Sequence, residues 1–309
     1  MTIPTLDRRI RLAEAAQRYY VEGWSQDQVA DLLDTSRSNV SRLLHAARRE
    51  GVVRFIIDHP LQRHPALEQR LTELYGVNKA MVVAGTDSSL DLVGRTAAGA
   101  VRDSIADRST IAIGWGRTVE ATIDSIDTDH PRDVSVVQVG GDLAMAPSAS
   151  GHELVKRLAH RLGGRHRFLH APALVASEAV ADELLSDPHI GRGLALAAEA
   201  GTALIGIGLP GVGFADKAVS DSYTGDRTPA AVVCARLIDA TGEELPGPLR
   251  RRVIAIELDA LRAVPHVIGV AAGAEKGAAI AATLRGGLLD TIVCDQSAAA
   301  AAIEAGEMA

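Results

Sequence analysis

Short apolar runs alternate with amphipathic helical stretches through most of this 309-residue chain, and this alternation narrows the possible folds more than any other feature. Eight runs have the length and composition of strands: 79–85, 110–116, 134–141, 203–208, 230–239, 252–258, 266–273 and 290–295. Residues 90–107, 117–126, 151–162, 176–186 and 275–285 show helical periodicity. Strands that are apolar throughout are buried on both faces. The pattern therefore predicts an α/β fold with a mostly parallel sheet covered by helices on both sides.

Composition agrees with a well-packed protein whose core is built from small and aliphatic residues. Hydrophobic residues make up 47% of the chain but aromatic residues only 3%, so Ala, Val, Leu and Ile must fill the interior. Cys234 and Cys294 lie in apolar strand-like runs, which predicts buried free thiols rather than disulfides or a metal site. No apolar run reaches the roughly 18 residues that span a membrane, and the charged, helical N-terminus differs from a signal peptide. We expect a cytoplasmic protein.

The first 56 residues follow a different pattern, a series of short helices. Helical spacing covers residues 7–22, and Gly23 ends that helix. Ser25 is suited to cap a helix over 26–33, and Ser36, at the end of a turn, to cap a helix over 37–50. A strand-like run at 52–60 and an amphipathic helix at 61–75 then lead into the second domain. We predict a small all-α domain at 1–56 and an α/β domain at 57–309.

Two short helices around a tight turn, with small polar and basic residues opening the second helix, are typical of a helix-turn-helix that reads DNA. Arginine can bind guanine O6 and N7, and asparagine can bind adenine N6 and N7, whereas arginines near the helix end are better placed for phosphates. The residues expected to contact double-stranded operator DNA are Ser25, Gln26, Ser36, Arg37, Ser38, Asn39, Ser41, Arg42, Arg48 and Arg49. The alternative is a helical hairpin with a solvated arginine face.

The distribution of charge agrees with DNA binding by this end of the chain. The whole chain has a formal net charge of −7, but residues 1–54 contain nine arginines against seven acidic residues, a net charge of +2. Within 36–54, five arginines stand against a single acid, Glu50. A basic end on an acidic body directs one face of the molecule to DNA phosphates and keeps the rest away.

Several stretches together resemble one known family. They are QDQVADLLDTSRSNVSRLLHAARREGVV, IGWGRTV, VVQVGGD, RLID and GVAAGAEKGAAIAATLRGGLLDTIVCDQSAA, spread over nearly the whole chain. These stretches are similar to the SorC family of sugar-responsive bacterial transcription regulators. The resemblance implies a helix-turn-helix domain followed by a Rossmann-like effector domain, similar in fold to sugar-phosphate isomerases and deaminases. It also implies a sugar phosphate or related polyol as effector, and a homo-oligomer, typically a tetramer.

We expect the effector site at the carboxyl ends of the parallel strands, where open sheets bind ligands. Gly114, Trp115, Gly116, Arg117 and Thr118 follow a strand and open a helix, whose first amides favour an anion. A plain strand-to-helix turn that needs glycine is the alternative. Trp115 would either cover the pocket or fill packing space.

Two other strand ends carry further candidates for effector binding. The first group is Gln138, Gly140, Gly141 and Asp142, and the second is Gly273, Ala274, Glu275 and Lys276. Asp142 would bind sugar hydroxyls or cap a turn. Lys276 lies near a helix start, where a cation and nearby amides can neutralise a phosphate. A solvated surface lysine is the alternative, and a Schiff base with an aldehyde effector is a third option.

The remaining motifs point less sharply to a site. Asp239 ends the run VVCARLID, where an acid contacts ligand hydroxyls in the family that the chain resembles; a turn cap is the alternative. The run at 206–213 matches GxGxxG, but Pro210 stands where a helix should begin, which favours a pocket-lining or surface loop over a dinucleotide site. His160, His166 and His170 lack the pattern of metal ligands, so we expect no metal.

These features predict an effector-controlled repressor or other transcription regulator of a carbohydrate-catabolism operon, with no cofactor and no enzymatic activity. The main alternative is a sugar-phosphate isomerase or deaminase with an appended helical module, because the folds overlap. The sequence shows no acid–histidine pair that suggests turnover. A nucleotide- or NAD-responsive repressor is a third candidate, which the lack of an acidic partner for the glycine-rich run disfavours.

Overall fold

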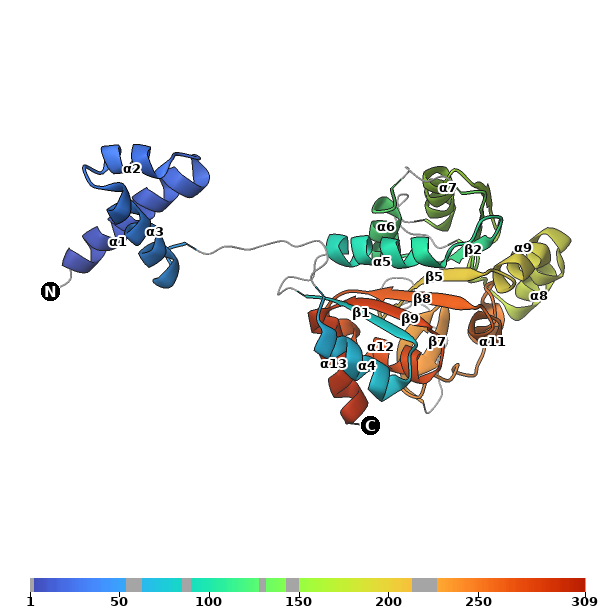
Figure 1. The fold of residues 1–309 in the computed structure, drawn as a ribbon. Coiled ribbons are helices and arrows are strands. Elements are labelled where there is room, and N and C mark those ends of the chain that lie inside the picture. The colour runs from blue at the N-terminus through green and yellow to red at the C-terminus, as the bar shows by residue number, and fades with distance from the viewer. Residues whose placement is uncertain are drawn as a thin grey trace. The chain divides into compact units, whose positions relative to one another are not determined.

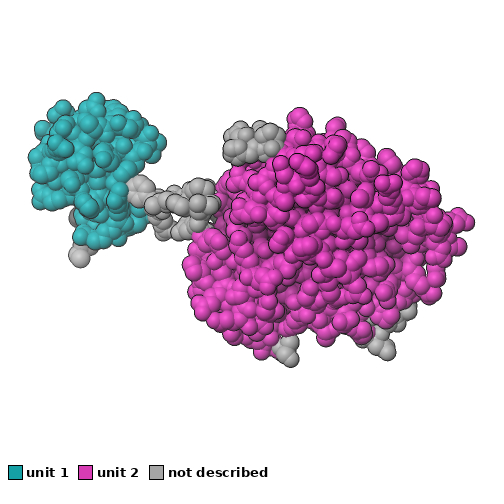
Figure 2. All heavy atoms as spheres, turned by 45° about the vertical axis from the view of Figure 1, so that its right-hand side comes forward, with its two compact units in different colours: residues 1–59 teal, residues 60–309 magenta. Residues whose placement is uncertain are grey.

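The computed structural model describes residues 3–53, 63–84, 90–127, 132–142, 150–212 and 227–308. The chain divides into two compact units, residues 1–59 and 60–309 (Figure 1, Figure 2). Each unit has its own hydrophobic core. The predicted boundary between residues 56 and 57 falls in the segment 54–62, outside the described residues.

The first unit packs helices around a tight turn. α1 (Ile3–Ala16) continues as a π-helix, η1 (Gln17–Val21), and α2 (Gln26–Leu32) and α3 (Arg37–Arg49) follow. Ser25 and Ser36 cap α2 and α3 as predicted, and Ser25 forms a reciprocal capping box with Gln28. The buried core consists of Leu12, Ala15, Ala16, Val29, Ala30, Leu33, Val40, Leu44, Ala46 and Ala47.

The second unit is built on a seven-stranded sheet, counted over the described residues, in the order β1-β9-β8-β5-β2-β3-β4. Every neighbouring pair of strands is parallel. The strands are β1 (Lys79–Val83), β2 (Thr110–Ile113), β3 (Ser135–Gln138), β4 (Arg165–Arg167), β5 (Thr202–Gly206), β8 (His266–Ala271) and β9 (Thr291–Asp295). The predicted α/β fold with a parallel sheet is confirmed.

Helices cover both faces of this sheet (Figure 1). α5 (Leu90–Ser104), α6 (Arg117–Asp124) and α7 (Gly151–Leu162) pack on one face. The other face is covered by α4 (Pro65–Tyr75), α9 (Pro188–Ala198), α11 (Leu258–Arg262), α12 (Gly277–Arg285) and α13 (Gln296–Glu307). Successive residues of one strand enter different cores: Ile111 and Ile113 face the first group of helices, and Ala112 faces the second.

Two predicted strands are wrong. The run 230–239 is an antiparallel hairpin of β6 (Pro229–Val233) and β7 (Arg236–Asp239), separate from the main sheet. Cys234 and Ala235 form its turn at φ values of 49° and 63°, where glycine, asparagine or aspartate is usual. Because the sequence has none of these residues at the turn, the hairpin could not be recognised from it. The run 252–258 passes from a 3-10 turn, η3 (Arg250–Arg252), through isolated bridges into α11.

Two elements were not predicted from the sequence, whereas the two cysteines lie as expected. β4 was not predicted because its residues, Arg-His-Arg, are exposed and polar. α9 was not recognised as a separate helix because it follows α8 (Glu178–Ser186) after a single residue. Cys234 and Cys294 are buried free thiols, as predicted, and burial raises the pKa of the Cys234 thiol to about 12. None of the described helices is both long and apolar enough to cross a membrane.

Gly94 sets how closely α5 approaches α6. A Cβ at this position would lie 2.5 Å from the carbonyl oxygen of Ala121. Because that oxygen belongs to the backbone of α6, the clash can be relieved only if the two helices move apart. We expect Gly94→Ala to lower the free energy of unfolding by about 1–3 kcal/mol, as overpacking usually does. Gly99→Ala on the same helix, where a Cβ meets nothing within 4 Å, should raise it by up to about 1 kcal/mol. Equal midpoints of the two variants in urea denaturation would contradict this packing.

Candidate functional site

The strand order creates a switch point between β2 and β5. The chain leaves β2 toward β3 and β4 on one side, and leaves β5 toward β8 and β9 on the other. In open parallel sheets, diverging connections form a crevice at the carboxyl ends of such strands, and ligands bind there. The predicted residues 114–118 follow β2, and the loop before Lys276 follows β8, which is the next strand beyond β5.

Lys276 and Arg117 bring two positive charges to this switch point. Lys276 is half-buried, and its Nζ donates a hydrogen bond to the carbonyl oxygen of Ile207, 2.9 Å away and directly after β5. Burial lowers the pKa of Lys276, Glu275 raises it, and the nearby Arg117 guanidinium lowers it further. Arg117 itself is exposed at the start of α6. Within the described ranges, no carboxylate lies at ion-pair distance from either cation.

Glycine backbone allows the three loops to meet. A Cβ on Gly206 would lie 2.9 Å from the carbonyl oxygen of Trp115, so β5 passes the end of β2 at close range. Gly116, at a φ of 123°, is the N-cap of α6 and leaves the first amides of that helix without a side-chain cap. Trp115 packs against the cores on both faces of the sheet and so fills the space at their junction. We call residues 114–118, 206–208 and 273–276 the switch-point cluster. Its other predicted members are Thr118, which is half-buried, and Ala274 and Glu275, which are exposed.

Asp295, which no sequence pattern singled out, holds the loop before Lys276. Its buried carboxylate ends β9 and accepts hydrogen bonds from the backbone nitrogens of Gly273 (2.6 Å) and Ala298 (2.8 Å). It also accepts one from Ser297 Oγ (2.5 Å). The same carboxylate therefore caps α13 and fixes the turn at Gly273. The available signal was an acid directly after the apolar run TIVC.

The residues at the end of β3, Gln138, Gly140 and Gly141, make close contacts within the protein. The buried Gln138 side chain accepts a hydrogen bond from Leu169 N (2.9 Å) and donates one to the carbonyl oxygen of Gly140 (3.3 Å). A Cβ on Gly140 or Gly141 would lie within 2.7 Å of the neighbouring segments at 254–255 and 171–172. These residues join the sheet to the segments that extend it.

Asp142 forms an acid–histidine pair that the sequence did not reveal. Its Oδ1 accepts a hydrogen bond from Gly151 N at the start of α7 (2.8 Å), and its Oδ2 lies 3.5 Å from His152 Nδ1. His152 Nε2 lies 3.3 Å from the carbonyl oxygen of Leu169. Both ring nitrogens thus face protein oxygens, an arrangement that fixes the imidazole and leaves no nitrogen turned to a substrate.

Asp239 occupies a different place from the switch-point cluster. Its nearly buried carboxylate accepts hydrogen bonds from Thr241 N (2.9 Å) and Oγ1 (2.6 Å), and it forms an ion pair with Arg227. Burial opposes ionisation, but these hydrogen bonds lower the pKa of Asp239 below its ordinary value. The turn that follows packs against Gly286, past the C-terminal end of α12, whereas Lys276 precedes the N-terminal end. Asp239 therefore acts here as a turn cap, the alternative reading of its sequence position.

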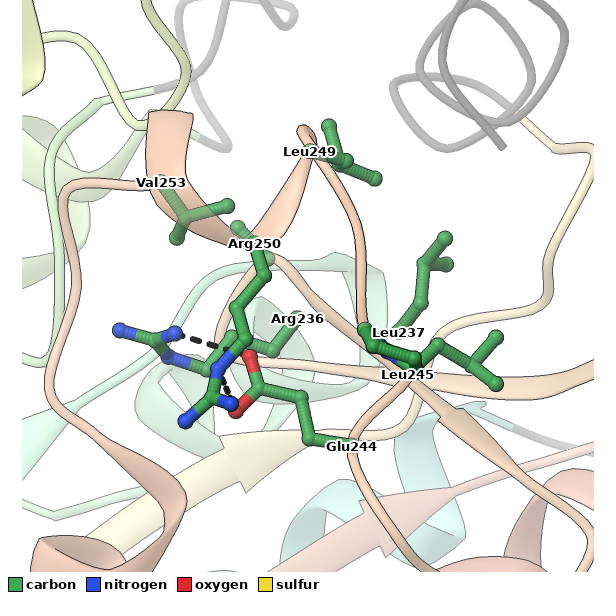
Figure 3. Close-up of a pocket in the computed structure, with 9 residues that line it drawn as sticks. Arg236, Leu237, Glu244, Leu245, Leu249, Arg250 and Val253 are labelled. Carbon is green, nitrogen blue, oxygen red and sulfur yellow. Dashed lines mark hydrogen bonds and ion pairs between the residues drawn. The ribbon is translucent and has the colours of Figure 1, made fainter. Parts of the chain in front are cut away.

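A hollow beside β7 has a different chemistry (Figure 3). Arg236 and Arg250 pair with Glu244 and Glu257 in a closed ring, in which each carboxylate contacts both arginines. The side chain of Arg236 is only 2% exposed and also donates to two backbone carbonyl oxygens. The other lining residues are mainly apolar, among them Leu237, Leu245, Leu249 and Val253. Because the ring is electrically neutral, this hollow offers no unpaired cation to a phosphate.

The glycine-rich run and the histidines show no cofactor or metal geometry within the described residues. Residues 207–212 contain a turn and an isolated bridge from Gly208 to Val232, and no helix begins there. Gly213 lies outside the described part of the chain. No group of three or more His, Cys, Asp and Glu side chains in the described ranges could hold a metal ion.

In the first unit, the starts of α2 and α3 lie together and present several predicted DNA contacts. Arg37 Nε lies 3.9 Å from Asp27 Oδ1, with both side chains largely exposed. Ser25 caps α2 and Gln26 begins it, so the predicted residues of both helices border one surface. Arg37, Ser38 and Arg42 are exposed, and Ser41 is half-buried.

Other predicted DNA contacts already have protein partners. Asn39 Nδ2 donates to Thr35 Oγ1 at 2.7 Å, so an adenine contact by Asn39 requires this bond to break. Ser36 Oγ accepts from Asn39 N and lies 3.0 Å from Ser38 Oγ. The Arg48 guanidinium lies over the ring of Tyr20 at 5.4 Å. Arg49, 78% exposed, is 3.8 Å from Glu50.

His45 also lies exposed on α3 and was not singled out. It follows Arg42 by three residues and Ser38 by seven, which places it on the same helix face. This spacing was the available signal.

Comparison with known proteins gives consistent results over both units. Residues 59–304 match the family described as "Putative sugar-binding domain". The chain is 28% identical over 307 residues to the deoxyribonucleoside regulator of Bacillus subtilis (strain 168), covering 94% of this chain and 96% of that protein. It is 26% identical over 303 residues to the sorbitol operon regulator of Klebsiella pneumoniae, covering 93% and 96%. The crystal structure of the full-length sorbitol operon regulator SorC from Klebsiella pneumoniae has a TM-score of 0.72 to this chain, at 24% identity, covering 96% of this chain and 99% of the other.

Asp295→Asn tests how the loop before Lys276 is held. The amide group of asparagine must point an N–H at Gly273 N or at the donors that open α13, so one hydrogen bond is lost. We expect a loss of about 1–3 kcal/mol of stability and faster amide exchange at 273–276, measured by hydrogen-exchange mass spectrometry. Ser297→Ala is the control, because it removes one bond to the same carboxylate but leaves the Gly273 bond. Unchanged exchange in Asp295→Asn would mean that another contact holds the loop.

Proposed function

The chain belongs to the SorC-type family of transcriptional regulators that carry a sugar-binding domain, and on this basis we propose that it controls a carbohydrate-catabolism operon in response to a sugar phosphate or related polyol. The relatives are named as a deoxyribonucleoside regulator and a sorbitol operon regulator, not as enzymes, which favours regulation over sugar-phosphate isomerisation. The fixed Asp142–His152 pair also speaks against turnover.

The pair of cations at the switch point carries the effector part of this proposal. Lys276 is half-buried with one carbonyl partner, and Arg117 lies close enough to lower its pKa. A partly buried positive charge without an ion-pair partner is costly, and Glu275 offsets only part of that cost. A phosphate between the two cations would offset the rest. The uncapped first amides of α6 supply further donors to the same phosphate.

The exposed start of α3 supports the DNA-binding part. Arg37, Ser38 and Arg42 are exposed on the N-terminal half of α3. In a recognition helix this is the part that contacts base edges. Two such helices must be about 34 Å apart, or a multiple of that, to occupy successive turns of a pseudo-palindromic operator. We therefore propose a homo-oligomer, a tetramer by family resemblance, which acts as a cytoplasmic repressor or activator without a cofactor. The effector shifts the preference between DNA-competent and incompetent arrangements of the subunits.

Arg37→Ala and Arg42→Ala test the recognition surface. Each loss of a base-contacting arginine should weaken binding to a selected duplex by about 1–3 kcal/mol and relax its sequence preference. The duplex is obtained by selection from a random pool with the full-length protein, and affinities are measured by gel shift at physiological salt. Arg167→Ala, an exposed arginine on β4, is the matched control and should bind normally. Normal binding by both α3 variants would place the recognition surface elsewhere.

Lys276→Ala tests the phosphate contact. The sugar phosphate that stabilises the protein most in a thermal-shift screen is compared with its unphosphorylated parent by calorimetry. We expect the variant to lose roughly tenfold to a hundredfold in affinity for the phosphate, the effect of one charge-assisted hydrogen bond, and little for the parent. Lys156→Ala, an exposed lysine on α7, should retain both affinities. Equal losses for the two ligands would show that Lys276 does not bind phosphate.

A further inference from the structure

We propose that His45 contacts a DNA backbone phosphate as a protonated imidazole, so that DNA binding by the first unit strengthens as the pH falls. The inference rests on the proposed DNA-binding function and adds one contact to it. It begins from the geometry of α3, on which the buried side chains Val40, Leu44 and Ala47 form the inward face. At 3.6 residues per turn, Ser38, Arg42, His45 and Arg49 recur at intervals of three and four residues on the outward side.

The imidazole of His45 is available for such a contact. The residue is exposed, and within the described residues it takes part in no hydrogen bond, ion pair or ring contact. Its charged neighbours one turn away on α3 are Arg42, Arg48 and Arg49, all exposed. This outward face of α3 therefore carries positive charge and hydroxyl groups but no acid.

The elements packed against α3 direct their charges elsewhere. Arg8 of α1 pairs with Glu50 at 2.6 Å, just past the end of α3. Asp27 of α2 lies 3.9 Å from Arg37 at the opposite end of the helix. Among the described residues, no carboxylate forms an ion pair with Arg42 or His45 in the middle of this face.

The position of His45 along the helix favours phosphate over base contact. It lies nine residues after Ser36, about 13 Å along the helix axis from the end that enters the groove. Contacts at that distance from the recognition end are mostly with the DNA backbone. Histidine changes its charge between pH 5 and 8, and an ion pair with phosphate favours the protonated imidazole. A protonated imidazole at this position would add one cation to the face that already holds Arg42 and Arg49.

The salt dependence of DNA binding tests this contact. Full-length protein is titrated against a duplex pool of random sequence at pH 6 and pH 8 over a series of salt concentrations, by fluorescence anisotropy. Each phosphate contact steepens the plot of log affinity against log salt by about 0.9. We expect the wild-type slope to be steeper at pH 6 than at pH 8 by about 0.9 for each first unit that is bound to DNA. His45→Gln should give the pH 8 slope at both pH values, and His45→Arg the steeper slope at both.

Controls separate this inference from the DNA-binding proposal itself. His189→Gln, an exposed histidine in the second unit, should keep the wild-type difference in slope, and Arg42→Ala should weaken binding at both pH values. A wild-type protein that binds DNA, together with a His45→Gln variant that keeps the full pH dependence, would overturn the role of His45 alone. If His45→Gln lowers affinity for a duplex selected from the pool but not for the random pool, His45 reads bases. That result would also overturn the phosphate contact. Failure of the wild type to bind any duplex would overturn both proposals.

Discussion

Burial of both faces of a parallel sheet determines where this protein can hold a ligand. Because Ile111 and Ala112 enter different cores, helices must cover both faces, and the strand ends remain as the open edge. Parallel pairing brings the carboxyl ends of all strands to that edge, and the strand order then separates the connections between β2 and β5. Arg117 and Lys276, distant in sequence, interact because one opens the helix after β2 and the other follows β8.

The protein accommodates its buried cations in two different ways. Arg236 is almost completely buried, and two carboxylates and two backbone carbonyl oxygens compensate its charge within the fold. Lys276 has one carbonyl oxygen, and its lowered pKa reflects burial without comparable compensation. A buried charge is costly unless it is paired. The contrast separates a cation whose charge the fold compensates from a cation whose charge the fold leaves largely uncompensated.

Sequence patterns predicted what depends on local chemistry. The caps at Ser25 and Ser36 need only a hydroxyl before a helix, and the buried strands need only apolar runs, so both were predicted. The turn at Cys234 lacks the usual glycine and is held by its packing, so the hairpin was missed. Asp295 and Asp239 could not be separated, because each is an acid after an apolar run. Tertiary contacts alone join Asp295 to the Gly273 loop and place Asp239 beside the far end of α12.

Control by an effector requires a ligand that binds two arrangements of the protein with different affinity. The switch-point cluster offers a physical basis for such a difference. Arg117 begins α6 on one face of the sheet and Lys276 precedes α12 on the other, so their mutual repulsion acts on helices that belong to opposite layers. The phosphate of the proposed function would replace repulsion with attraction and favour the arrangement in which the two helix starts are close. An interaction that recognised an anion here would therefore also bias the relative positions of the two layers, and a small ligand would in this way influence a surface that it does not touch.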